Sequence, residues 1–156
     1  MLRRKTEMFP IGKITVTTTD GVVTDIAITE TDFHDDDLAA GNALRQLREY
    51  FDGQRFRFDF ETTYVSGTPF QKAVWDFLRT IPYGETVSYR EVAEAIGKPN
   101  ACRAVGSAVG RNPLLIVNPC HRVVASDGIG GFAYGISMKQ QLLLLEKKYK
   151  ERFLCE

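Results

Sequence analysis

Hydrophobic and polar residues alternate as in β-strands near the beginning of the chain. Residues 12–28 contain two β-rich runs on either side of Asp20-Gly21, a dipeptide typical of the two-residue turn of a hairpin. Residues 55–60, with the sequence RFRFDF, alternate in the same manner. This part of the chain is therefore predicted to contain a hairpin and a third strand.

A helical period lies between these two strand regions. Within residues 38–53, Leu44, Leu47 and Phe51 recur on one side of a helix, and Gly53 is a favourable stop. The acidic segment before this helix is expected to face solvent. The order of elements, βαβ, predicts a small α/β lobe.

The next helix has a clear start signal. Thr68 is a good N-cap and Pro69 suits the first helical position, so a helix is predicted through residues 70–81. Residues 62–68, with the sequence TTYVSGT, lack a periodic pattern. We interpret them as a linker.

Two short helices close together predict a helix-turn-helix in the second part of the chain. Ser88 and Glu91 form an S-x-x-E capping box ahead of residues 89–96. Asn100 is expected to cap a further helix over residues 101–110. Two helices joined by such a short turn are typical of a helix-turn-helix.

The helix predicted over residues 101–110 carries few large side chains. Its sequence, ACRAVGSAVG, permits close approach of another surface, and Gly106 weakens the helix by about 1 kcal/mol relative to alanine. One interpretation is tight packing against a neighbouring helix. The other is contact with a nucleic-acid backbone, with Arg103 projecting from the first turn. Residue chemistry alone favours neither.

Length, composition and charge limit the possible functions. The 156 residues, 44% of them hydrophobic, suffice for one core or two small lobes, which we assign to residues 1–62 and 63–156. The formal net charge is zero, but residues 1–62 hold 8 Lys and Arg against 12 Asp and Glu, whereas the remainder holds 12 against 8. The second domain is therefore the one that could approach a phosphate backbone.

The sequence contains no evident targeting, disulfide or metal pattern. No stretch approaches the roughly 18 apolar residues of a membrane span, so a cytoplasmic protein is expected, or a nuclear one in a eukaryote. Cys102, Cys120 and Cys155 are odd in number and unpaired in spacing, which predicts reduced thiols. His34 lies among aspartates but has no second histidine or cysteine nearby, so no metal site is expected.

Cys120 and His121 are the strongest candidates for chemistry. The thiolate is the nucleophilic form of cysteine and requires a base or a cation nearby, and His121 is the obvious base. Neighbouring residues of an extended chain point to opposite sides, so the pair requires a turn of the backbone or a bridging water. The alternative is that Cys120 is simply a buried hydrophobic residue.

Glu146 is the candidate partner for the second ring nitrogen of His121. A histidine used as a base needs an acceptor that fixes its tautomer. Glu146 lies one turn beyond Leu142, at the border of the apolar side of a helix predicted over residues 136–152. The alternative is a surface ion pair with Lys150, four residues later.

These motifs occur together in one known family. The segments VSYREVAEAIG, RAVGSAVGRNP, PCHRV and LLLLE, in that order within residues 68–147, resemble the O6-alkylguanine-DNA alkyltransferase family. The resemblance implies a two-lobed α/β (α+β) fold, with an N-terminal RNase H-like lobe and a mostly helical C-terminal helix-turn-helix (winged-helix-like) domain. It also implies a DNA repair protein that extrudes O6-alkylguanine from duplex DNA and transfers the alkyl group irreversibly, in a single turnover, to its own cysteine.

The resemblance implies roles for the residues around the thiol. Cys120 is the residue that accepts the alkyl group, and Glu146, His121 and a water form the relay that generates its thiolate. Asn112 links the recognition helix to the active-site turn. Tyr89 rotates the 3′ phosphate and can hydrogen-bond the guanine.

Contacts with DNA and with the extruded base follow from the same resemblance. Arg103 takes the space of the flipped nucleotide, and the helix that carries Ala104 and Ser107 lies in the minor groove. Extrusion is needed because the target atom is unreachable inside a duplex. The substrate pocket is then implied to use four groups: the backbone carbonyls of Cys120 and Val123, and Phe132 and Lys139 of the pocket loop.

The chain departs from the family pattern in two places. Asn118 stands where an aliphatic residue is usual before the proline, and the loop after Cys120 is one residue shorter than in some members, so Tyr134 and Ser137 receive no role. Some members bind zinc through N-terminal cysteine and histidine, but residues 1–62 contain no cysteine. We expect no cofactor or metal, a monomer, double-stranded DNA as the partner, and no membrane association.

Two other classes of function use parts of this constellation. A cysteine hydrolase also needs Cys, His and an acid, but it requires an oxyanion hole, and no helix N-terminus is expected at the thiol of Cys120. A module that binds DNA lesions without transfer needs no nucleophile. The intact mass after incubation with alkylated DNA discriminates among the three, because only transfer adds one alkyl group per chain.

Overall fold

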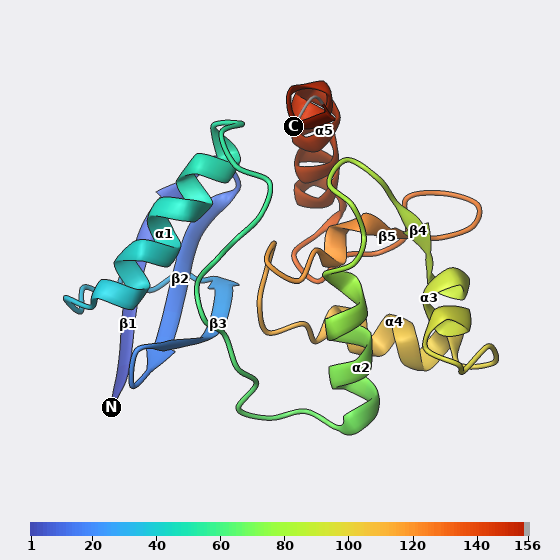
Figure 1. Ribbon diagram of the computed structural model, residues 1–156, viewed down its shortest axis with the longest axis horizontal. Coiled ribbons are helices and arrows are strands. Elements are labelled where there is room, and N and C mark those ends of the chain that lie inside the picture. Colours follow the sequence, from blue (N-terminus) through green and yellow to red (C-terminus); the bar gives the residue numbers. More distant parts are fainter. Residues whose placement is uncertain (155–156) are drawn as a thin grey trace. The chain divides into compact units, whose positions relative to one another are not determined.

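The computed structural model describes residues 1–154, so Cys155 lies outside the described part (Figure 1). The chain forms two compact units. The first comprises Met1–Val65 with Pro113–Leu115, and the second comprises Ser66–Asn112 and the segment that begins at Ile116. Helices and strands are mixed, which confirms the α/β class expected from the sequence.

A three-stranded antiparallel sheet opens the first unit. Its order is β1 (Leu2–Phe9), β2 (Gly12–Thr19), β3 (Val22–Ile28). Asp20 and Gly21 both have positive φ, 49° and 83°, as a two-residue hairpin turn requires, so the predicted hairpin is confirmed. Strand β1 was not predicted, because its residues 3–5 are all basic and hide the alternation.

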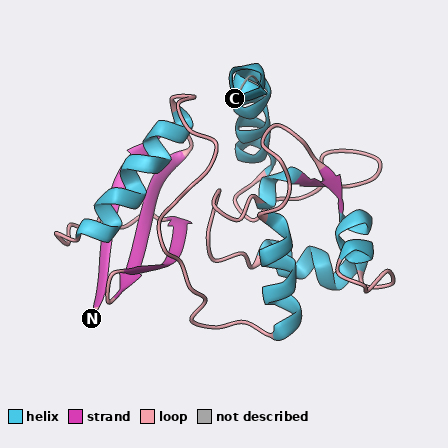
Figure 2. Ribbon diagram, viewed as in Figure 1, coloured by secondary structure: helices cyan, strands magenta, loops and turns pink. Residues whose placement is uncertain are grey.

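Helix α1 (Leu38–Phe51) lies along one face of this sheet (Figure 2). Leu44 and Leu47 are fully buried, as the predicted apolar stripe requires. The helix begins at Asp37, whose side chain accepts hydrogen bonds from Ala40 N (3.0 Å) and Thr18 Oγ1 (2.7 Å). The acidic segment therefore does more than face solvent, because one of its carboxylates caps the helix.

The prediction of a strand over residues 55–60 is wrong. No ladder forms there, and this irregular segment is held by side chains of α1 instead. Gln46 Oε1 accepts from Asp59 N (3.1 Å), and Glu49 accepts from Arg55 Nε (3.0 Å). The order of elements in the first unit is therefore βββα, not βαβ.

The second unit is mostly helical. Its helices are α2 (Pro69–Leu78), α3 (Tyr89–Ala95), α4 (Cys102–Gly110) and α5 (Ile136–Leu154), with one 3-10 turn, η1 (Cys120–Arg122). Two short strands, β4 (Val87–Ser88) and β5 (Val123–Val124), pair in parallel. This pair places the end of η1 beside the beginning of α3 (Figure 1).

Two of the three N-caps predicted in the second unit are confirmed. Thr68 and Ser88 both form complete capping boxes, which confirms the starts of α2 and α3. Helix α4, however, begins after Ala101 and has no side-chain cap, so the prediction that Asn100 caps it is wrong. Ala101 N donates to Lys98 O (2.9 Å) in the preceding turn, and this backbone bond fixes the chain just ahead of the helix.

Helix α4 packs closely against α2 and α3. Val105, Ala108 and Val109 are its buried residues, and Trp75 Nε1 of α2 donates to Ala108 O (2.8 Å). Among residues 1–154, no helix is both long enough and apolar enough to cross a lipid bilayer.

Candidate functional site

Cys120 lies in the 3-10 turn η1, so the backbone at this cysteine turns rather than continuing as an extended strand. The sequence PCHR begins with Pro119, whose ring favours such a turn. Cys120 and His121 are both buried, with relative exposures of 6% and 0%. The turn directs Cys120 to a pocket, while the His121 ring bonds to α5.

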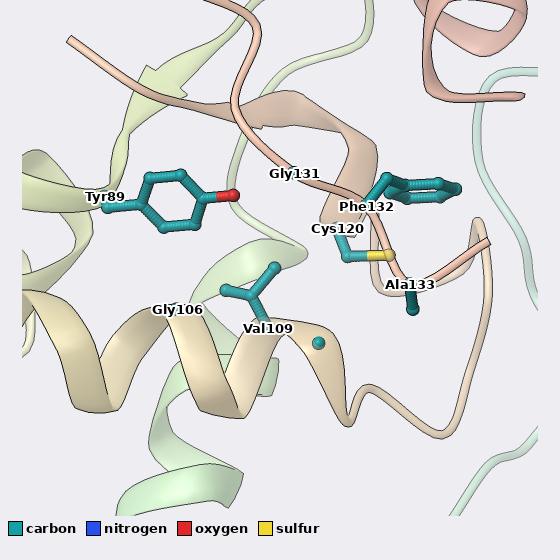
Figure 3. A pocket seen from close by; sticks show the side chains of 8 residues that line it. Tyr89, Gly106, Val109, Cys120, Gly131, Phe132 and Ala133 are labelled. Atoms are coloured by element: carbon teal, nitrogen blue, oxygen red, sulfur yellow. The ribbon is translucent and has the colours of Figure 1, made fainter. Parts of the chain in front are cut away.

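The pocket beside the thiol has a volume of about 200 Å³ (Figure 3). Helix α4 forms one wall, the turn η1 supplies the sulfur, and the loop after β5 closes the other side. Phe132 and Ala133 of that loop line the same pocket as the Cys120 side chain (Figure 3). The complete lining is Tyr89, Gly106, Val109, Gly110, Cys120, Gly131, Phe132 and Ala133.

Glu146 of α5 is buried and forms the centre of a hydrogen-bonded cluster. Its Oε2 lies 2.6 Å from His121 Nε2, while Arg122 donates through Nε to Oε1 (2.8 Å) and through Nη2 to Oε2 (2.9 Å). Gly84 N donates to Oε1 as well (3.0 Å). With 1% of its surface exposed, Glu146 is a buried partner of His121, and the alternative of a surface pair with Lys150 is wrong.

The charges of this cluster favour a neutral His121. Burial would raise the pKa of the Glu146 carboxyl, but the hydrogen bonds from His121 and Arg122, together with the positive charge of Arg122, hold it well below its usual range. Burial lowers the pKa of His121, and this effect exceeds the opposing influence of Glu146. A neutral ring that donates from Nε2 leaves a lone pair on Nδ1, and that atom has no hydrogen-bond partner within residues 1–154.

The thiol itself is tuned by opposing influences. Burial raises the pKa of Cys120, while a hydrogen bond from the side chain of Asn112 and the positive charge of Lys139 lower it. Asn112, just beyond α4, also donates from Nδ2 to Asn118 O (2.8 Å). A thiol in these surroundings is protonated at rest and needs a base to become a nucleophile.

Lys139 lies in the first turn of α5 rather than in the pocket loop, which corrects the placement expected from the sequence. Its side chain is fully buried, and Nζ donates to three backbone carbonyls, those of Val123 (2.7 Å), Ile129 (2.6 Å) and Gly131 (2.9 Å). The Val123 carbonyl, which was expected to accept a hydrogen bond from a guanine amine, therefore already accepts one from Lys139. Cys120 O likewise accepts from Val123 N within the turn.

Tyr89 is the first residue of α3, and its ring stands against the pocket. A Cβ added at Gly106 would lie 4.0 Å from this ring, and one added at Gly130 only 3.2 Å away, so small residues leave room for it on both sides. Burial raises the pKa of the Tyr89 hydroxyl. Lys139 Nζ lies 6.0 Å from the centre of the ring.

The outer side of α4 is exposed and carries the residues expected to meet DNA. Arg103, Ala104 and Ser107 are all exposed, whereas Val105 and Val109 are buried on the opposite side. Both expected roles of the small residues are therefore compatible with this helix. Ala108 permits close packing against the neighbouring helices, and Ala104 and Ser107 leave the exposed side without large side chains that would keep a DNA backbone away. Arg103 does not line the pocket.

Sequence reasoning missed three groups of this site. Arg122, which follows the Cys-His pair, binds both oxygens of Glu146, and Gly84 contributes a backbone N–H to the same carboxylate. Asn118 was noted only as a departure in packing, yet it is fully buried and bonded to Asn112. The sequence did contain a signal that Arg122 has a specific partner. It directly precedes the apolar pair Val123-Val124, and a charged residue is rarely buried beside such a pair unless it is paired.

The described part of the chain offers no cluster of metal-binding side chains. Among residues 1–154, no three His, Cys, Asp or Glu side chains gather as metal ligands would. Cys102, exposed at the first position of α4, and Cys120, which is buried, are both free thiols within residues 1–154.

Comparisons with known proteins agree on one family. A family model described as "6-O-methylguanine DNA methyltransferase, DNA binding domain" matches residues 69–148. A methylated-DNA--protein-cysteine methyltransferase of Mycolicibacterium paratuberculosis is 42% identical over 157 residues, which cover 96% of this chain and 94% of the relative. A crystal structure of Mycobacterium tuberculosis O6-methylguanine methyltransferase is 42% identical with a TM-score of 0.87, covering 96% of this chain and 94% of that one. The M. tuberculosis OGT in complex with DNA is 43% identical with a TM-score of 0.87 and 94% coverage of both chains.

Proposed function

This chain belongs to the 6-O-methylguanine DNA methyltransferase family, and from that membership we infer how its site acts. The protein repairs DNA by transferring an alkyl group from O6-alkylguanine to a cysteine of its own. Cys120 is the acceptor in this proposal, since it is the described cysteine that lines a pocket. The transfer consumes the cysteine, so each chain acts once.

The proposed reaction begins with removal of the thiol proton. His121 Nδ1 accepts this proton through a bridging water, and Glu146, fixed by Arg122, stabilises the imidazolium that results. The sulfur then attacks the alkyl carbon, so that an S–C bond forms as the C–O6 bond breaks. The electron pair of the broken bond passes to the guanine, which takes up one proton, in balance the one that left the thiol, and remains in the DNA as unmodified guanine.

The pocket is proposed to hold the extruded base. Phe132 offers an aromatic face, and the Tyr89 hydroxyl is placed to hydrogen-bond the guanine ring (Figure 3). Val123 O retains a second lone pair beside its bond to Lys139 and can still accept from the exocyclic amine. Lys139 supports this pocket from behind by holding the loop.

The exposed side of α4 is proposed as the DNA-binding surface. Ala104 and Ser107 allow the helix to lie close to the duplex in the minor groove, and Arg103 fills the stack where the lesion leaves it. Residues 63–156 form the alkyltransferase and DNA-binding domain in this proposal. The protein acts as a monomer without a cofactor, in the cytoplasm, or in the nucleus of a eukaryote.

The buried Cys120 beside the His121–Glu146 pair carries this proposal, and its test is an intact mass measurement. The protein is incubated with duplex DNA that contains one O6-methylguanine. The expected result is a gain of one methyl group on the peptide that contains Cys120, with none in the Cys120→Ser variant. Turnover of lesions without a change in protein mass would contradict the proposed function.

A further inference from the structure

We propose that Asn118 and Arg79 are positioning residues, which hold the amide of Asn112 in the orientation that directs its NH2 group to Cys120. The inference rests on the proposed function, because it concerns how the nucleophile is prepared. It extends the site from the thiol to an exposed arginine at the end of α2.

The chain of contacts begins at Arg79, the C-cap of α2. Its Nε lies 2.5 Å from Asn118 Oδ1. A guanidinium can only donate, so the atom of Asn118 that faces it must be the amide oxygen. The amide nitrogen of Asn118 is thereby turned the other way, toward Asn112.

The second amide is fixed by the first. Asn118 Nδ2 donates to Asn112 Oδ1 (3.1 Å), and Asn112 Nδ2 donates back to Asn118 O (2.8 Å). A flipped Asn112 would place its nitrogen against a donor and its oxygen against a carbonyl, which loses both bonds. The second hydrogen of Asn112 Nδ2 remains for the Cys120 sulfur, and this side-chain hydrogen bond lowers the pKa of the thiol.

Because the Asn118 amide is buried, losing its hydrogen bond to Asn112 would leave a polar group without a partner and would destabilise the fold. Asn118 is fully buried, so its side-chain amide can be satisfied only by protein groups. An aliphatic side chain there would leave Asn112 anchored by the Asn118 backbone carbonyl alone. Arg79 is exposed, so solvent screens its charge, and its contribution is the direction of a hydrogen bond.

The test measures the pKa of Cys120 directly. The rate of alkylation by iodoacetamide is followed from pH 6 to pH 10 on the peptide that contains Cys120, so that Cys102 and Cys155 do not contribute. Asn118→Leu removes both polar atoms at similar volume, and Arg79→Met removes only the outer donor. We expect the pKa to rise by about half a unit to one unit in Asn118→Leu, a three- to tenfold lower rate at neutral pH. Arg79→Met should give a smaller rise, and Arg79→Lys should recover part of it.

A double-mutant comparison separates positioning from general structure. If both residues act through Asn112, their effects on the Cys120 pKa disappear in an Asn112→Ala background. Lys98→Met is the matched control, because it removes one exposed cation of the same unit whose side chain forms no hydrogen bond or ion pair within residues 1–154, and it should leave the pKa unchanged.

Two results would overturn the inference. One is an unchanged pKa in both Asn118→Leu and Arg79→Met; the other is an equal rise with and without Asn112. If Asn118→Leu fails to fold, Arg79→Met at the exposed end still decides. A protein that shows the expected pKa shifts but gains no alkyl group from DNA would contradict the proposed function and not this inference.

Discussion

Replacing Glu146 by glutamine should damage the fold as well as the chemistry. The carboxylate accepts four hydrogen bonds, one from His121 (2.6 Å), two from Arg122 (2.8 and 2.9 Å) and one from Gly84 N (3.0 Å). Glutamine offers one oxygen and one NH2 group, so at least one donor must face another donor. Arg122, only 6% exposed, also loses its counter-charge.

The size of the effect follows from this arrangement. Breaking a buried ion pair by removing one partner typically costs about 3–5 kcal/mol. At roughly 2–4 °C per kcal/mol for a chain of this size, the melting temperature should fall by about 6–20 °C. Transfer should slow by about 10²-fold or more, because an NH2 group facing Nε2 favours the wrong tautomer of His121.

The assay is a thermal melt of wild type and Glu146→Gln by circular dichroism, with single-turnover transfer measured well below both melting temperatures. Lys147→Gln is the control, since it removes an exposed charge from the same helix whose side chain makes no hydrogen bond or ion pair within residues 1–154. A melting temperature within 2 °C of wild type would refute the reasoning, because it would mean that the carboxylate does not hold Arg122 in solution.

Three further outcomes are expected. Because the folded-state pKa of Glu146 is depressed, its stabilisation is present above its unfolded pKa, near 4.3, and should be lost as the pH falls below that value, which acid melts of wild type and Glu146→Gln will check. Arg103→Ala should slow repair of a duplex lesion more than reaction with free O6-benzylguanine, and equal losses would mean that Arg103 supports the fold or the pocket instead. Methylation of Cys120 should lower the melting temperature by roughly 2–4 °C, because the pocket has room for the methyl group but the thioether loses about 1 kcal/mol of hydrogen bonding to Asn112; coincident melts of free and methylated protein would contradict this.

Local signals in the sequence were sufficient for most helices. Thr68 and Ser88 cap their helices by side-chain bonds to residues three positions later, and such contacts depend only on neighbouring residues. Asn100 carries the same chemistry but does not cap, because a backbone turn from Lys98 to Ala101 precedes the helix. A capping residue in the sequence therefore permits a helix start without fixing its position.

Contacts between distant segments were beyond the sequence. Residues 55–60 alternate like a strand, yet their partners are the side chains of Gln46 and Glu49, which no periodicity can indicate. Periodicity could not identify the partners in the candidate site either. From the sequence alone, Glu146 could equally be a surface residue, and Asn118 indicated only a local change in packing. Only the fold shows that Arg79 and Asn112 meet across Asn118.

The hydrogen bonds that Lys139 donates to the pocket loop allow the side chains of that loop to vary in sequence. Its three acceptors are backbone carbonyls, which every residue supplies, so substitutions at Phe132 or Ala133 do not remove any of these bonds. Gly130 is the exception, because its φ is +76° and an added Cβ would lie 3.0 Å from Ala125 N. The loop can thus keep its path while its side chains diversify. Selection could exploit this freedom to adapt the protein to bulkier lesions without changing the support behind the pocket.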